Sequence, residues 1–139
     1  MDGLRRTLKD GIAAGAVAAV VSGAPSTSWA LVAGRDPLEP TLAAGALLLP
    51  REQRRGRLVA AAVPVHLALS IGWAVVLAAL LPRGRAVSGG ALAGFLIVAL
   101  DLGIVGWRSA RVRPLPLLPQ VADHVLYGAT VGFVLDRRR

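Results

Sequence analysis

The stretch LVAAAVPVHLALSIGWAVVLAALLP (58–82) runs for 25 residues without a charged side chain, and its only ionisable group is His66. A helix needs about 20 apolar residues to cross the roughly 30 Å hydrocarbon core of a bilayer. Helices at the surface of a soluble domain instead show apolar residues on one face only, with a period near 3.6. The stretch therefore predicts a membrane-spanning helix over 58–81, with a bend at Pro64.

Three further blocks of the sequence have the same character. Residues 11–34 carry no charge, residues 86–107 are interrupted only by Asp101, and residues 114–135 only by Asp123 and His124. Arginine-rich segments separate the blocks. We therefore predict an all-α, four-helix transmembrane bundle that forms a single integral membrane domain (1–139). Its expected spans are 11–33, 58–81, 87–107 and 119–135.

The first block is too long for the apolar region of a signal peptide. Its small residues also run through the whole block instead of marking one cleavage site, so we expect a retained span. Within it, SGAPSTSW (22–29) predicts an interruption, since Pro25 stops or kinks a helix. Ser26 is expected to cap a new helical turn that runs to Ala33.

The connection between the first two spans contains a shorter apolar piece, GRDPLEPTLAAGALLLP (34–50). Its uncharged part is 11 residues long, which is too short to span a bilayer. Pro40 lies where a helix would start and Pro50 just beyond its end. We predict a short interfacial or re-entrant helix over 38–50.

Small residues recur at intervals of four in three of the predicted spans. Lipid provides no hydrophobic drive between helices, so close backbone approach through small residues favours their association. The same stripes could pack one subunit against another, which leaves a homo-oligomer as an open alternative. The residues predicted to pack are Gly11, Gly15, Ala19, Gly23, Gly90, Gly94, Gly128 and Gly132.

The formal net charge of +8 comes mainly from arginines at the ends of the predicted spans. There they would meet lipid phosphates, and no basic face with interleaved aromatic residues predicts nucleic-acid binding. The expected partner is the lipid bilayer of a cell (plasma) membrane. Four spans would place eight basic residues on each side of the membrane, so the positive-inside rule favours neither orientation. The first helix often decides orientation, which favours both termini in the cytoplasm.

Six residues form a candidate buried polar cluster, because the predicted helices place them in one half of the bilayer. A carboxylate at the centre of a span costs about 2.5–3.5 kcal/mol, so Asp101 should face the bundle and find a partner. Either histidine could be that partner. The cluster is either a structural contact that fixes helix register or a site for a proton, cation or small ligand. Its members are His66, Ser70, Asp101, Asp123, His124 and Tyr127.

Catalytic and cofactor chemistry has weaker support in the sequence. Two histidines and two carboxylates could ligate a divalent metal, but no HExxH spacing is present. Ser70, His66 and Asp101 are the residue types of a hydrolytic triad, but no nucleophile elbow accompanies them. The glycines form neither GxGxxG nor GxxxxGK, and the chain has no cysteine. We predict no cofactor, no metal and no catalytic residues.

Three stretches carry a resemblance to known proteins: SGAPSTSWAL (22–31), GRDPLEPTLAAGALLLP (34–50) and DHVLYGATVGFVLDRRR (123–139). There the chain resembles small, uncharacterised four-helix membrane proteins of GC-rich bacteria. The resemblance implies the membrane fold and brings no activity with it. In size and span number the chain is also similar to small multidrug resistance exporters. Those exporters depend on a glutamate in their first helix, whereas no carboxylate lies between Asp10 and Asp36 here.

Three classes of function stay open at this point. A non-enzymatic packing or accessory membrane protein needs only the glycine stripes, and it is the function we expect. A small proton- or cation-coupled transporter needs Asp101 and His66 to face a wet cavity. An intramembrane enzyme needs a nucleophile or metal that the sequence does not identify.

Overall fold

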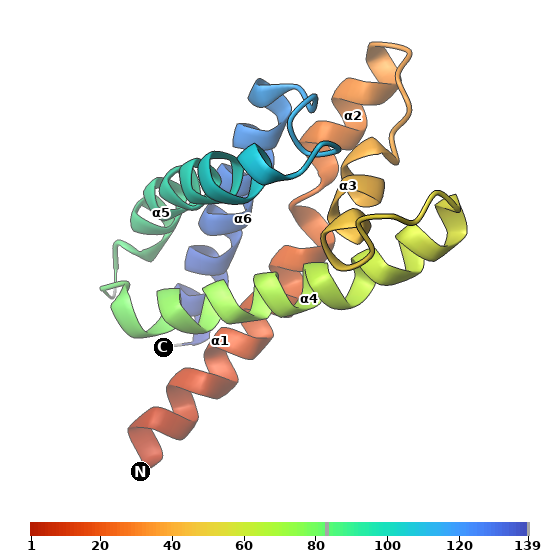
Figure 1. Ribbon diagram of the computed structural model, residues 1–139. Coiled ribbons are helices and arrows are strands. Elements are labelled where there is room, and N and C mark those ends of the chain that lie inside the picture. Colours follow the sequence, from red (N-terminus) through yellow and green to blue (C-terminus); the bar gives the residue numbers. More distant parts are fainter. Residues whose placement is uncertain (83, 139) are drawn as a thin grey trace.

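The computed structural model describes residues 1–82 and 84–138, and within them every regular element is a helix (Figure 1). The all-α prediction is therefore confirmed for the described chain. The elements are α1 (Asp2–Val21), α2 (Ala24–Val32), α3 (Glu39–Leu48), α4 (Arg55–Leu80), α5 (Ala86–Leu100), the π-helical segment η1 (Asp101–Gly106) and α6 (Leu117–Arg138).

Three helical stretches are long and apolar enough to cross a membrane in the described part of the chain. They are Asp2–Val32, which joins α1 to α2, then Arg55–Leu80, which is α4, and Ala86–Gly106, which joins α5 to η1. They correspond to the first three predicted spans. The fourth, 119–135, does form a helix, but α6 is not among the apolar candidates. A bundle of four spanning helices is therefore not confirmed.

The composition of α6 follows from its position in the molecule. This helix contacts α5, α1, α2 and α4, and it buries Gln120 and Tyr127 against them. Because neighbouring helices cover much of its surface, α6 can carry polar side chains that a lipid-facing helix could not. Its 22 residues give a length of about 33 Å, comparable with the hydrocarbon core.

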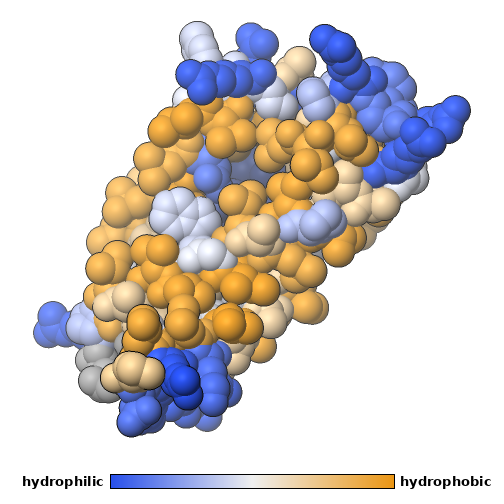
Figure 2. Space-filling view, turned by 60° about the horizontal axis from the view of Figure 1, so that its bottom comes forward, coloured by the Kyte–Doolittle hydropathy of each residue, from blue (hydrophilic) through white to orange (hydrophobic). Residues whose placement is uncertain are grey.

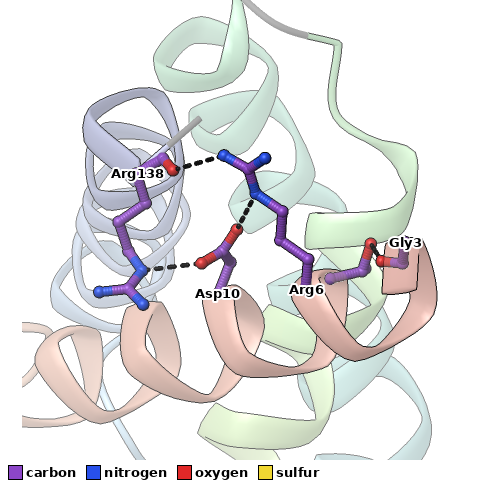
Figure 3. Close-up of polar contacts among 5 residues, drawn as sticks. Gly3, Arg6, Asp10 and Arg138 are labelled. Carbon is purple, nitrogen blue, oxygen red and sulfur yellow. Dashed lines mark hydrogen bonds and ion pairs between the residues drawn. The ribbon is translucent and has the colours of Figure 1, made fainter. Parts of the chain in front are cut away.

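One end of the molecule gathers both chain termini (Figure 1). Arg138 Nε lies 2.9 Å from Asp10 Oδ1, and Arg6 Nε lies 3.9 Å from the other carboxylate oxygen. Figure 3 shows Asp10 between the two arginines. The backbone N–H of Gly84 donates to Asp136 Oδ1 at 3.3 Å. These contacts tie the start of α1 and the α4–α5 turn to the end of α6.

The opposite end is built from α2, α3 and the connection after η1 (Figure 1). Arg55 at the start of α4 lies 2.6 Å from Asp36, and Arg111 donates to Gln53 at 2.9 Å. The Arg55 guanidinium holds the pKa of the Asp36 carboxyl below its ordinary value, so this pair stays ionised. The helix predicted over 38–50 is present as α3, which packs on α4.

One face of the molecule carries a broad apolar band between charged ends (Figure 2). Large apolar side chains of the long helices point outward, with Val20 84% and Leu96 57% exposed. Soluble monomers rarely expose contiguous apolar patches beyond a few hundred Å². The band and the three apolar helical stretches fit a membrane protein.

One local prediction needs correction, and within another the type of helix changes. The first span is interrupted as expected, but Gly23 is the N-cap of α2, and Ser26 lies three residues inside the helix. Ser26 cannot act as the cap because its own N–H is one of the donors to be capped. The third span does not stay α-helical, since its hydrogen bonding changes to the π pattern at Asp101. Helix α4 continues through Pro64 without interruption.

Candidate functional site

The contact between α5 and α6 depends on glycines that leave room for backbone against backbone. A Cβ added at Gly90 would overlap the carbonyl of Gly128, and one added at Gly132 would overlap the carbonyl of Ala86. A Cβ at Gly94 would overlap the carbonyl of His124. Any larger residue at these positions must therefore push the two helices apart.

A second glycine contact joins α1 to α4. A Cβ added at Gly11 would lie 2.7 Å from Val75 Cα, and one at Gly15 would lie 2.8 Å from Ile71 Cα. By contrast, Gly23 is exposed and a Cβ there would meet nothing within 4 Å, so Gly23 lies outside this packing surface. Apart from Gly23, the glycines of the predicted stripes pack against other helices of the same chain. They are therefore not available for contact with a second copy.

Gly45 of α3 is a packing residue that the sequence pattern missed. A Cβ added there would overlap the carbonyl of Leu58 in α4. Gly45 has no small residue four positions before or after it, so no stripe signals its role. Its contact holds the short helix α3 against α4.

Asp101 and His124 are two titratable side chains that contact each other. Asp101 Oδ2 lies 3.3 Å from His124 Nε2, and His124 Nδ1 lies 2.8 Å from the carbonyl oxygen of Gln120. The carbonyl can only accept, so Nδ1 carries a hydrogen. One proton then remains for the contact between Nε2 and the carboxyl group. Either a neutral imidazole accepts from a protonated carboxyl, or an imidazolium donates to a carboxylate.

The glycine contact between α5 and α6 positions this pair. Gly94 lies against the backbone of His124, and Asp101 follows seven residues later, about two helical turns on the same face. The Asp101 side chain is 29% exposed and that of His124 is 23% exposed. Asp101 also opens η1, and π-helical segments inside α-helices are frequent at functional sites.

Asp123 precedes His124 in the chain but serves a different helix. Its Oδ1 accepts the backbone N–H of Ser26 at 2.9 Å. That N–H is one of the unpaired donors in the first turn of α2, where a negative charge is also favoured by the helix dipole. Asp123 therefore caps α2 from a distant part of the sequence.

The remaining members of the predicted cluster make contacts of their own. His66 Nε2 lies 2.8 Å from the carbonyl oxygen of Ala19, which joins α4 to α1. The Tyr127 hydroxyl donates to the carbonyl of Ser70, which joins α6 to α4. Hydrogen bonds join two pairs of the predicted cluster, Asp101 with His124 and Tyr127 with Ser70, while His66 and Asp123 bond to backbone groups of α1 and α2. The hydrogen-bond partner of Asp101 is His124 and not His66, whose partner is the carbonyl of Ala19.

The possible metal ligands of the predicted cluster do not gather into one group in the described part of the chain. No three His, Cys, Asp or Glu side chains come together there in a way that could hold an ion. The two histidines bind different partners, and the two carboxylates of the cluster point toward different helices.

The sequence pattern did not predict the ion pairs of the buried residue Asp10. This residue is 6% exposed although it lies in the polar segment 1–10, just before the first predicted span. The spacing Arg6–Asp10 does signal an i,i+4 helix pair. The closer partner, Arg138, comes from the other end of the chain, and no local pattern signals it.

Comparison with known proteins does not assign the chain to a family. No protein-family model matches it, and no curated protein or solved structure matches it either. The resemblance to small four-helix bacterial membrane proteins stays a prediction.

Proposed function

We propose that the protein is a non-enzymatic packing or accessory component of a bacterial inner membrane, built as a small multi-pass bundle. In this proposal it acts through its lipid-facing surface, by contact with other membrane proteins or further copies of itself. Both termini are proposed to lie in the cytoplasm.

One observation carries the proposal. Each ionisable side chain of the candidate cluster, together with Asp10, is engaged in joining two different elements. His66 joins α4 to α1, Asp123 joins α6 to α2, and Asp10 joins α1 to α6. The pair of Asp101 and His124 joins η1 to α6. Groups used in this way hold helices in register, which is the structural use of polar residues in a span.

A second candidate function is proton- or cation-coupled transport. It is favoured by the contact between Asp101 and His124, which holds one proton between two groups that can each release it. The pair is only partly buried, and it lies at the change from α- to π-helix. A carrier would need this proton to exchange with one side of the membrane at a time.

A proton-flux assay with Asp101→Asn distinguishes the two functions. The purified chain is reconstituted into vesicles that enclose a pH-sensitive dye, and a potassium diffusion potential drives protons inward. We expect wild-type vesicles to acidify no faster than protein-free vesicles. Asp101→Asn should leave this rate unchanged and lower the melting temperature, because the contact with His124 is weakened.

Asp123→Asn is the matched control, since it alters a neighbouring carboxylate with a capping role. Flux above that of empty vesicles, lost in Asp101→Asn but kept in Asp123→Asn with both variants folded, would make the accessory function wrong and establish the carrier.

A further inference from the structure

The end of the molecule formed by α3 contains a cleft that none of the contacts described above explains. It has a volume of about 230 Å³ and lies between α3 and the connection that follows η1. This is smaller than the roughly 300–1,000 Å³ of sites for drug-sized ligands. The cleft is lined by Arg35, Glu39, Leu42, Ala43, Ala110, Arg111, Pro114 and Leu115.

The cleft has a positively charged part and an apolar part. Arg35 and Arg111 supply two guanidinium groups from two different connections, while Leu42 and Leu115 supply apolar walls from α3 and from the second connection. Guanidinium groups bind phosphate oxygens through paired hydrogen bonds. An amphiphile with a phosphate at one end and a hydrocarbon chain at the other matches this combination.

Tryptophans place the cleft at the level of lipid headgroups. Trp29 lies near the end of the stretch Asp2–Val32, and Trp107 directly follows the stretch Ala86–Gly106. Tryptophan is enriched at the boundary between hydrocarbon and water, and Trp107 is 76% exposed. The guanidinium carbon of Arg35 lies 5.5 Å from the Trp29 ring centroid, so the cleft borders this boundary.

The charge of this end favours an anionic ligand. Residues 34–57, which include α3 and the first residues of α4, and residues 108–116 together contain eight arginines and three carboxylates. Clusters of basic residues next to a span attract anionic lipids. Glu39 lies within the cleft and binds Arg35 at 3.0 Å, which reduces the positive charge available there. Removing this carboxylate should therefore strengthen binding of an anion.

We propose that this cleft binds the headgroup of an anionic phospholipid, with the phosphate between Arg35 and Arg111 and an acyl chain along Leu42 and Leu115. The site would fix a lipid against α3 and the connection after η1. This inference goes beyond the proposed function, since both an accessory protein and a carrier could hold such a lipid.

Native mass spectrometry of the full chain in detergent tests the site. The variants are Arg35→Gln/Arg111→Gln and a control, Arg54→Gln/Arg113→Gln, which removes the same charge from exposed positions at the same end. We expect the cleft variant to weaken phosphatidylglycerol binding about tenfold and the control less than threefold. Glu39→Gln should tighten binding, and phosphatidylcholine should bind the wild type more weakly than phosphatidylglycerol.

Three outcomes would overturn the proposal. Equal losses in the cleft and control variants would show diffuse attraction to the basic end. Competition by millimolar inorganic phosphate as effective as that by phosphatidylglycerol would show a phosphate site without a lipid chain. Weaker binding in Glu39→Gln would show that the carboxylate belongs to the ligand contact and does not oppose it.

Discussion

Gly128→Ala is expected to lower the free energy of unfolding by about 3 kcal/mol, at the upper end of the range for overpacked cores. The added methyl group would overlap the carbonyl of Gly90, and backbone cannot rotate away as a side chain can. The helices α5 and α6 must separate, which also pulls Asp101 from His124. Thermal unfolding in detergent, followed by circular dichroism, measures the loss.

Gly72→Ala provides the matched control for this substitution. Gly72 lies in α4, and a Cβ there would meet nothing within 4 Å. Alanine is the better helix former by about 1 kcal/mol, so this variant should be as stable as the wild type or more stable. Equal destabilisation of both variants would mean that α5 and α6 do not meet at Gly90 and Gly128.

The second large effect is expected from a double-mutant cycle on Asp101 and His124. His124→Ala leaves a carboxyl group in a span without its partner, which should cost about 2 kcal/mol of unfolding free energy. Adding Asp101→Ala removes that unpaired group, so the double variant should lose less than the sum of the two single variants. We expect a coupling energy of about 1–2 kcal/mol, measured by the same unfolding assay.

A parallel cycle on Asp101 and His66 separates the two histidines. His66 contacts Ala19 of α1, so its coupling to Asp101 should fall below about 0.5 kcal/mol. A larger coupling with His66 than with His124 would contradict the helix arrangement described here.

The sequence predicted the helices well because their signal is local. Charge-free blocks and prolines mark where each helix can begin and end, and α3 and the break before α2 lie where the pattern places them. The membrane-spanning assignment of 119–135 stays a prediction, since α6 forms there but is not among the apolar candidates. A block without arginines reads as lipid-exposed, whereas α6 carries polar residues that other helices cover.

The polar contacts could be predicted only in part. Helical spacing placed Asp101 and His124 at a similar depth, but it could not choose between the two histidines as the partner. That choice depends on which helices touch, and the glycine contact of α5 with α6 decides it. Asp123 shows the same limit, since its partner is a backbone N–H that no side-chain pattern reveals.

The central claim is that the long helices lie in lipid with their charged connections in water, and cysteine labelling tests it most directly. The chain has no cysteine, so Leu96→Cys in α5 and Arg51→Cys in the connection before α4 can each be labelled alone. With a membrane-impermeant maleimide on both faces of vesicles, we expect rapid modification of Arg51→Cys and none of Leu96→Cys until detergent denatures the protein. Equal rates of modification in intact vesicles would contradict the account.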